Sequence, residues 1–196
     1  ITESFKIKEI RTLCFIYMFW ILGWSLAFQW YSPYSLQQFK VSPIEVDWGQ
    51  MVVGVTWILG GYYLNDFLIK RWNARPLIII ANGLTTLCLL GMAFSPSFFL
   101  FALFFLFGAL PSAFSWPNTL NLISINAPES VQGKVMGISQ SFQSLGFILA
   151  TIFGGVIAGL DRRTIYFFTA LFLFVSFLSL LLRHIRRPPS KTKEEK

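Results

Sequence analysis

Long apolar runs, separated by short charged breaks, dominate the sequence between residues 13 and 182. The breaks recur at intervals of about 20 to 30 residues, and an α-helix needs about 20 residues to cross a bilayer. Backbone polar groups cannot stay unpaired in lipid, so the runs are expected to be helices. The pattern predicts an all-α integral membrane protein with six transmembrane helices, at residues 13–38, 43–69, 76–95, 98–125, 128–160 and 164–182.

The composition also indicates a membrane protein. Apolar residues make up 55% of the 196 residues and charged residues only 13%, which is too few to cover the surface of a soluble domain. We expect one transmembrane bundle over residues 13–185. A cytoplasmic lead-in is expected at residues 1–12 and a cytoplasmic tail at residues 186–196.

The basic residues are sorted by side of the membrane. If the N-terminus is cytoplasmic, the outer segments hold only Lys40, Arg162 and Arg163, and the inner segments hold the other 13 of the 16 Lys and Arg residues. This distribution follows the positive-inside rule and predicts that both termini are cytoplasmic. The net charge of +7 is therefore a topology signal, and no nucleic-acid partner is expected.

The six spans divide into two triplets. Each triplet has a long, partly polar first helix, a second helix that contains glycine and a strongly apolar third helix. The triplets cross the membrane in opposite directions, because each holds an odd number of spans. This arrangement is typical of a 3+3 inverted repeat, which is common in secondary transporters.

The first span becomes polar in its outer half. Its apolar character fades at Gln29, yet no charge follows before Lys40, and Pro33 lies between them. We expect a kinked helix that continues through this region. Either a water-filled space lies beside it, or its Trp and Tyr residues form an interfacial aromatic belt.

Three stretches together resemble the C-terminal half of a major facilitator superfamily transporter. In the first, residues 28–48, an aromatic-Pro-Tyr-x-x-Gln segment leads to a Ser-Pro pair at the start of the second span. The second, residues 66–71, is similar to the family's cytoplasmic loop motif, with an acid followed four and five residues later by two bases. Tyr62 and Ile69 stand where that motif has glycines.

The third stretch is the most specific, and it is similar to the loop and eleventh helix of bacterial drug exporters, including tetracycline-type drug–proton antiporters. It comprises residues 127–137, followed by Gln140, Ser141, Ser144, Leu145 and Gly154-Gly155. The resemblance implies that the six spans are helices seven to twelve of twelve, which agrees with a first residue, Ile1, that is not Met. An N-terminal six-helix half is then an expected partner, and the expected location is the plasma membrane of a bacterium, its inner membrane.

The resemblance implies a secondary active transporter of small molecules that works by alternating access. Proton-coupled efflux of amphipathic or drug-like compounds is the leading hypothesis. An uptake carrier for a nutrient or metabolite stays open as an alternative, as does a receptor or scaffold that transports nothing. An enzyme, a metal or a cofactor is not expected, because no cluster of His, Asp, Glu or Cys lies at one membrane depth.

Charged residues and His are absent from the interiors of the predicted spans. Ionisable residues inside a membrane are costly and commonly mark ion or proton pathways. If transport is coupled to protons, the carboxylate that carries the proton is therefore expected in the N-terminal half.

Polar residues within the spans are candidate substrate ligands. Ser115, Asn118 and Asn121 recur every three residues and share one helical face, on a helix that the resemblance places beside the transport cavity. Gln140 and Gln143 share a face of the fifth span. Each set could instead hydrogen-bond to neighbouring helices and serve only packing.

Trp24, Phe28 and Gln29, near the middle of the first span, are further candidates. Aromatic rings at this depth could stack on a flat, apolar or cationic substrate, and the amide could fix its orientation. Ordinary core packing is the alternative. Trp57 in the second span is open to the same two interpretations.

Asp66, Lys70 and Arg71 form a gating loop according to the resemblance. The acid would face a helix N-terminus of the other half, where a carboxylate is favourable, and would brace the closed inner gate. The alternative is a surface acid that is solvated beside two bases.

The fifth span also carries a stripe of small residues at every fourth position. Such a stripe is typical of close packing between membrane helices. The residues are Gly146, Ala150, Gly154 and Ala158.

Overall fold

A computed structural model describes residues 8–159 and 161–185 of the chain. Most of the predicted lead-in, the last residue of the predicted fifth span and the predicted cytoplasmic tail lie outside the described residues. In the described part of the chain, every regular element is a helix. This confirms the all-α fold class.

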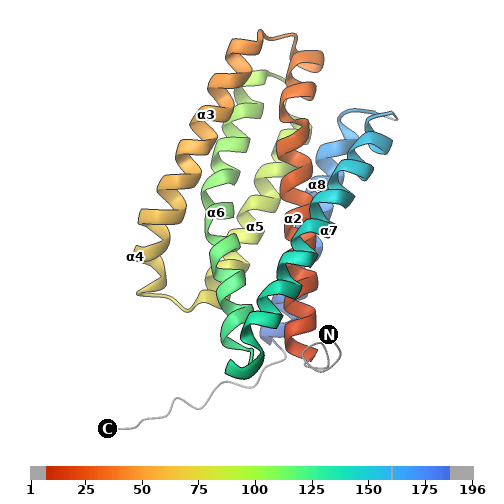
Figure 1. Ribbon diagram of the computed structural model, residues 1–196. Coiled ribbons are helices and arrows are strands. Elements are labelled where there is room, and N and C mark those ends of the chain that lie inside the picture. Colours follow the sequence, from red (N-terminus) through yellow and green to blue (C-terminus); the bar gives the residue numbers. More distant parts are fainter. Residues whose placement is uncertain (1–7, 160, 186–196) are drawn as a thin grey trace.

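Among the described residues, six helical segments are long and apolar enough to cross a membrane, as the sequence predicted. Several of them contain more than one type of helix (Figure 1). The elements are α2 (Lys8–Tyr34) with the π-helix η1 (Ser35–Phe39), α3 (Pro43–Leu59) with the π-helix η2 (Gly60–Leu64) and α4 (Asn65–Ile69), α5 (Ala74–Phe94), α6 (Phe98–Ile125), the 3₁₀-helix η3 (Glu129–Val131) with α7 (Gln132–Ala158), and α8 (Thr164–Ile185).

The first helix begins earlier than the sequence indicated. We expected the first span to start at residue 13, whereas α2 starts at Lys8. Charged residues near its start prompted the later boundary. The structure accommodates one of them, Glu9, by pairing its carboxylate with two arginines, so this residue can belong to a packed helix.

Local sequence signals explain where two helices begin. The Ser42 hydroxyl accepts a hydrogen bond from the Glu45 N–H at 3.4 Å, and the Glu45 carboxylate accepts one from the Ser42 N–H at 2.8 Å. This capping box, with Pro43 in the first turn, starts α3. Ser97 caps α6 in a similar way, by accepting from the Leu100 N–H.

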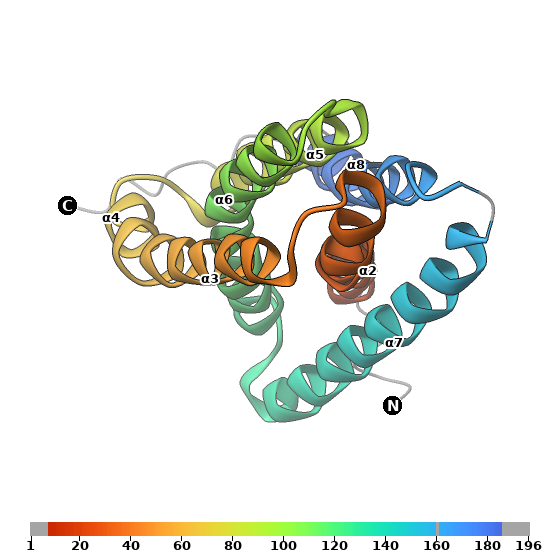
Figure 2. The same cartoon turned by 90° about the horizontal axis from the view of Figure 1, so that it is seen from above.

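The helices pack so that α2 lies in the middle of the bundle (Figure 2). Its main neighbours are α7 and α8, whereas α6 packs against α5 and α3, and α5 packs against α8. In the most apolar part of the first span 78% of the residues are buried, compared with 11% in the second span and 22% in the fifth. The second and fifth spans therefore flank the bundle and leave much of their surface uncovered.

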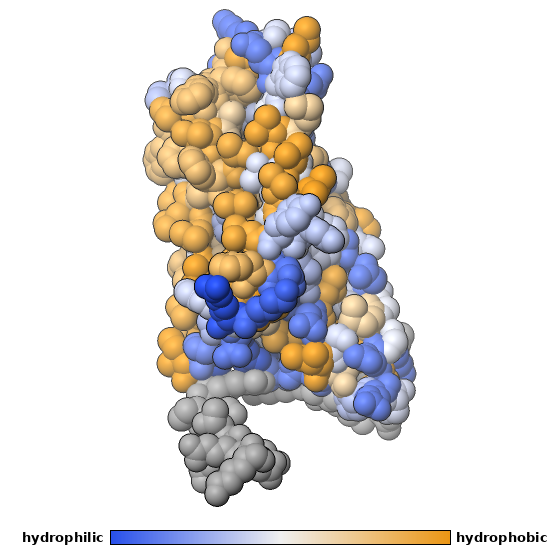
Figure 3. Space-filling model, turned by 90° about the vertical axis from the view of Figure 1, so that its left-hand side faces the viewer, coloured by the Kyte–Doolittle hydropathy of each residue, from blue (hydrophilic) through white to orange (hydrophobic). Residues whose placement is uncertain are grey.

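Charged residues gather at the two ends of the bundle. Arg75 and Arg183 reach Glu9, so the start of α2, the start of α5 and the end of α8 lie at one end. The turns at residues 40–42 and 95–97 lie at the other end (Figure 1). A broad hydrophobic band crosses the middle of the face seen in Figure 3, with hydrophilic side chains at its top and in its lower part.

Candidate functional site

A pocket of about 330 Å³ opens beside the central helix, between α2, α3, α6 and α7. Its volume is at the lower end of the range for small-molecule sites. Trp24, Phe28 and Gln29, three of the predicted substrate residues, line it together. The lining also includes Ile21, Ser25, Val53, Gly54, Trp57, Ile58, Trp116 and Phe147.

Tryptophan rings dominate this pocket. The rings of Trp24 and Trp57 are nearly parallel, with their centroids 6.1 Å apart and an angle of 11° between their planes. The Trp116 ring meets the Trp57 ring at 70°, with the centroids 5.4 Å apart. The Trp20 ring also belongs to this cluster, because it contacts the rings of both Trp24 and Trp116. Aromatic pairs at such distances add to the stability of the site.

Few polar groups reach the pocket wall. Ser25 is buried, and the Gln29 amide oxygen accepts a hydrogen bond from the Thr151 hydroxyl at 3.2 Å. The Trp57 indole N–H donates to the Ser112 hydroxyl at 2.7 Å, which fixes the ring against α6. The wall carries no Asp, Glu, Lys, Arg or His within the described residues. An apolar wall with a few placed polar groups can bind a small organic molecule.

Ser115 does not line this pocket. It is fully buried, and its hydroxyl donates to the Asn82 amide oxygen on α5 at 2.6 Å. The Asn82 amide N–H donates to the Ser176 hydroxyl on α8, which donates to the Ile16 carbonyl on α2. This chain of hydrogen bonds links four helices. It supports the packing interpretation that the sequence had left open for Ser115.

Asn118 and Asn121 also lie away from the pocket. The buried Asn118 amide N–H donates to the Asn65 amide oxygen at 2.6 Å, which connects α6 to the start of α4, and to the Phe114 carbonyl at 2.8 Å. Asn121 is exposed. The shared helical face that the sequence suggested is thus divided between a helix contact and the surface.

The two glutamines of the fifth span have different surroundings. The Gln143 amide oxygen accepts a hydrogen bond from the Tyr17 hydroxyl at 2.8 Å, which joins α7 to α2. Gln140 is exposed on α7. Neither residue lines the pocket.

The small residues of the fifth span lie where α7 contacts α2. Gly146 is buried against Met18 and Ile21, and Gly154 is buried against Leu26 and Trp30. Ala150, between them, is fully buried, and the side chain of Ala158 lies outside the described residues. A side chain at either glycine would collide with α2, so these positions allow the two helices to approach closely.

Sequence comparison identifies the kind of protein that carries this pocket. The sequence model of the Major Facilitator Superfamily matches residues 13–196. The chain belongs to this family. It is therefore a multi-pass membrane protein and a secondary transporter of small molecules, since members of the family are transporters rather than enzymes. Comparison with curated proteins gave no match.

Within the described residues, the side chains of the loop that resembles the family's cytoplasmic motif make local polar contacts. Lys70 donates to the Asp66 carboxylate at 2.6 Å, and both side chains are more than 60% exposed. The Arg71 guanidinium lies over the Phe67 ring, 4.3 Å from its centroid. An exposed ion pair one helical turn apart contributes little to stability, and this geometry agrees with the solvated-surface alternative.

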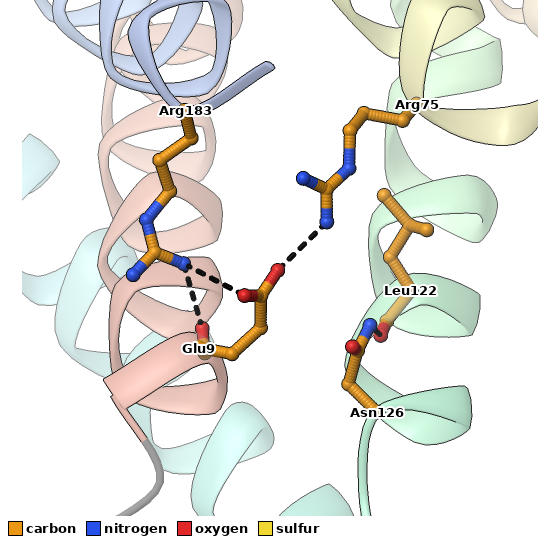
Figure 4. Close-up of polar contacts among 5 residues, drawn as sticks. All are labelled: Glu9, Arg75, Leu122, Asn126 and Arg183. Carbon is orange, nitrogen blue, oxygen red and sulfur yellow. Dashed lines mark hydrogen bonds and ion pairs between the residues drawn. The ribbon is translucent and has the colours of Figure 1, made fainter. Parts of the chain in front are cut away.

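Sequence reasoning missed two features of the superfamily member. Trp116, in the pocket wall, directly follows Ser115, one of the polar residues that the sequence singled out on that helix. Glu9 was assigned to the lead-in, but its carboxylate lies 2.7 Å from Arg75 and 3.7 Å from Arg183, whose guanidinium also donates to the Glu9 carbonyl (Figure 4). Its side chain is only 22% exposed. The cluster joins the start of α2, the start of α5 and the end of α8.

Proposed function

We propose that the protein exports amphipathic, drug-like compounds in exchange for protons and that the tryptophan-lined pocket is part of its substrate site. The observation that supports this proposal is the composition of the pocket wall, which combines aromatic and aliphatic side chains with Ser25 and Gln29 as its polar groups. Such a wall can accept varied apolar compounds, because stacking is less directional than a network of hydrogen bonds. A carrier of a polar nutrient would need more polar partners.

We further propose that residues 13–185 form one half of a twelve-helix transporter. The large uncovered surfaces of the second and fifth spans support this, because a second bundle could cover them. The packing also supports a 3+3 inverted repeat. The second helix of each triplet, α3 or α7, packs on the first helix of the other triplet, α6 or α2.

In this proposal the protein lies in the bacterial inner membrane with both termini in the cytoplasm. The charges support the orientation, because the outer turns contain only three basic residues, Lys40, Arg162 and Arg163. The gating loop of Asp66, Lys70 and Arg71 would then be cytoplasmic. A gating role for Asp66 requires that it exchanges Lys70 for a helix N-terminus of the second bundle.

Proton coupling needs a carboxylate that can release its proton during transport. Within the described residues every Asp and Glu lies close to a helix end or in a turn, and none lines the tryptophan pocket. We therefore place the proton-carrying group in the second bundle. Rocking of the two bundles would couple that group to the pocket.

Dye transport into inverted membrane vesicles tests the proposed function. Ethidium is a planar cation and Nile red a planar neutral dye, and we expect at least one of them to accumulate when a pH gradient is imposed. Phe28→Ala should slow accumulation by about fivefold, because it removes an aromatic face worth about 1 kcal/mol from the pocket. Phe28 is 44% exposed, so the fold should tolerate the change.

The matched control is Phe94→Ala, since Phe94 is 68% exposed and lies outside the pocket. This variant should transport at the rate of the unmodified protein. Absence of gradient-dependent accumulation of both dyes would contradict export of amphipathic compounds. Equal losses in the two variants would contradict the assignment of the pocket.

A further inference from the structure

The rings around the tryptophan pocket meet in a particular geometry. Trp24 and Trp57 are parallel within 11°, and Trp116 stands at 70° to Trp57. The Trp116 ring is thus turned steeply from the two parallel rings, and all three indoles line the pocket. Phe28 adds a further ring to the same lining. Rings that enclose a space from different directions form the kind of cage that binds quaternary ammonium groups.

The polar groups of the wall limit which charged ligands it can hold. An anion would find no Lys, Arg or His among the described lining residues. A primary ammonium group has three N–H donors. The side chains of the described lining residues offer it the Ser25 hydroxyl and the Gln29 amide, whose oxygen already accepts from Thr151. Donors that stay unpaired against an apolar wall are costly. Both kinds of ligand are therefore disfavoured.

A cation without N–H groups meets neither difficulty. The negative face of an indole ring attracts it, and tryptophan is the best of the aromatic residues for this contact. Its charge is covered by methyl or aryl groups, so it loses less hydration energy on entering an apolar space than a compact ammonium does. The cation is then held by ring faces without a carboxylate partner.

We propose that the tryptophan pocket selects organic cations whose charged centre carries no N–H group. This inference rests on the proposed function, because it names the substrate class of the same site. Trp24, Trp57 and Trp116 determine the selectivity. A quaternary ammonium compound therefore binds most tightly. The neutral compound of the same shape and the primary ammonium compound both bind more weakly.

Three compounds that share a benzyl group separate these possibilities. Benzyltrimethylammonium carries the quaternary charge, neopentylbenzene has nearly the same shape without charge, and benzylammonium carries a charge with N–H donors. The protein is purified from membranes and incubated with radiolabelled benzyltrimethylammonium, and each compound is added as competitor at matched free aqueous concentration. We expect benzyltrimethylammonium to compete at a concentration about tenfold lower than either of the others.

Substitutions of the tryptophans test whether their rings determine the preference for a quaternary cation. Trp116→Phe should lower the affinity for benzyltrimethylammonium, and Trp116→Leu should lower it further, because Phe is a weaker cation–π partner than Trp and Leu has no ring. The affinity for neopentylbenzene should stay nearly unchanged in both variants. Trp24→Phe serves as a second conservative variant if Trp116→Leu does not fold. Trp72→Leu is the control, because Trp72 is 51% exposed and lies outside the pocket.

Equal competition by neopentylbenzene would overturn the inference, as would benzylammonium competing as well as the quaternary compound. Unchanged affinity for benzyltrimethylammonium in both Trp116→Phe and Trp24→Phe would also overturn the inference. These outcomes are distinct from failure of the proposed function. The proposed function fails when the unmodified protein accumulates neither ethidium nor Nile red, whereas the inference fails on the order of the three affinities.

Discussion

Gly146→Leu is expected to lower the free energy of unfolding by about 2 kcal/mol, as overpacking of a close helix contact does. The Cβ position of Gly146 lies 2.9 Å from Ile21 Cγ2 and 3.0 Å from the Met18 carbonyl oxygen. The second of these neighbours is backbone and cannot rotate away, so α7 has to move off α2. Thermal unfolding of the purified protein in detergent, followed by circular dichroism, measures the loss.

Gly155→Leu is the matched control on the same helix. No heavy atom lies within 4 Å of the Cβ position of Gly155. The substitution changes helix propensity in the same way as Gly146→Leu, because both replace glycine with leucine in α7. It should not lower the unfolding temperature. If both variants lose the same stability, close packing of α7 on α2 does not depend on Gly146.

Glu9→Gln is expected to cost about 2 kcal/mol of stability, because it removes the carboxylate that pairs with both the Arg75 and the Arg183 guanidinium groups. The full penalty of a broken buried ion pair is larger, but the three side chains retain 11 to 22% exposure, and water screens the remaining repulsion. Adding Arg75→Gln should restore part of the loss. Unfolding temperatures of the single and double variants measure both effects.

Asp66→Asn is the control for this prediction. It removes the same charge from an ion pair in which both side chains are more than 60% exposed. Exposed pairs contribute at most about 1 kcal/mol, so its unfolding temperature should change little. If Asp66→Asn destabilises the protein as much as Glu9→Gln does, the contribution of the Glu9 cluster to stability does not depend on its burial.

The six spans could be predicted from the sequence because lipid imposes one simple condition. Every backbone polar group must be paired internally, and length with apolar character then defines a spanning helix. The start of the first helix could not be predicted in this way, because a charged residue near a helix start can have either of two environments. It can lie in solvent, or it can be paired, as Glu9 is with Arg75 and Arg183. Only the positions of α5 and α8 decide between them.

The pocket could be predicted only in part. Trp24, Phe28 and Gln29 meet there because they lie within two turns of one helix, and helical periodicity is readable from the sequence. Ser115 and Asn118 also have the expected periodicity, but a polar residue on a membrane helix is equally well satisfied by another helix. Their partners, Asn82 and Asn65, lie far away in the sequence. Periodicity alone does not reveal such partners.

Trp116 illustrates a different limit. It is separated from Trp57 by 59 residues, and the two rings meet only because α3 packs on α6. The sequence gives the depth of each ring in the membrane but not which helices are neighbours. The tryptophan cluster therefore required the three-dimensional arrangement, even though each of its rings lies in a predicted span.

Substrate protection of a cysteine in the pocket tests the central claim most directly. Gly54 lines the pocket and has no heavy atom within 4 Å of its Cβ position, so Gly54→Cys should fit without strain. Gly155→Cys is an equally open position outside the pocket. Both substitutions are made after Cys14 and Cys88 have been replaced by alanine. The rate of labelling with N-ethylmaleimide is then measured with and without the transported dye.

A dye at ten times its dissociation constant should slow labelling at position 54 by about tenfold, because only the unoccupied fraction reacts. Labelling at position 155 should not change. If the dye is transported but labelling at position 54 stays as fast as it is without dye, the substrate does not occupy the tryptophan pocket, and the account is contradicted.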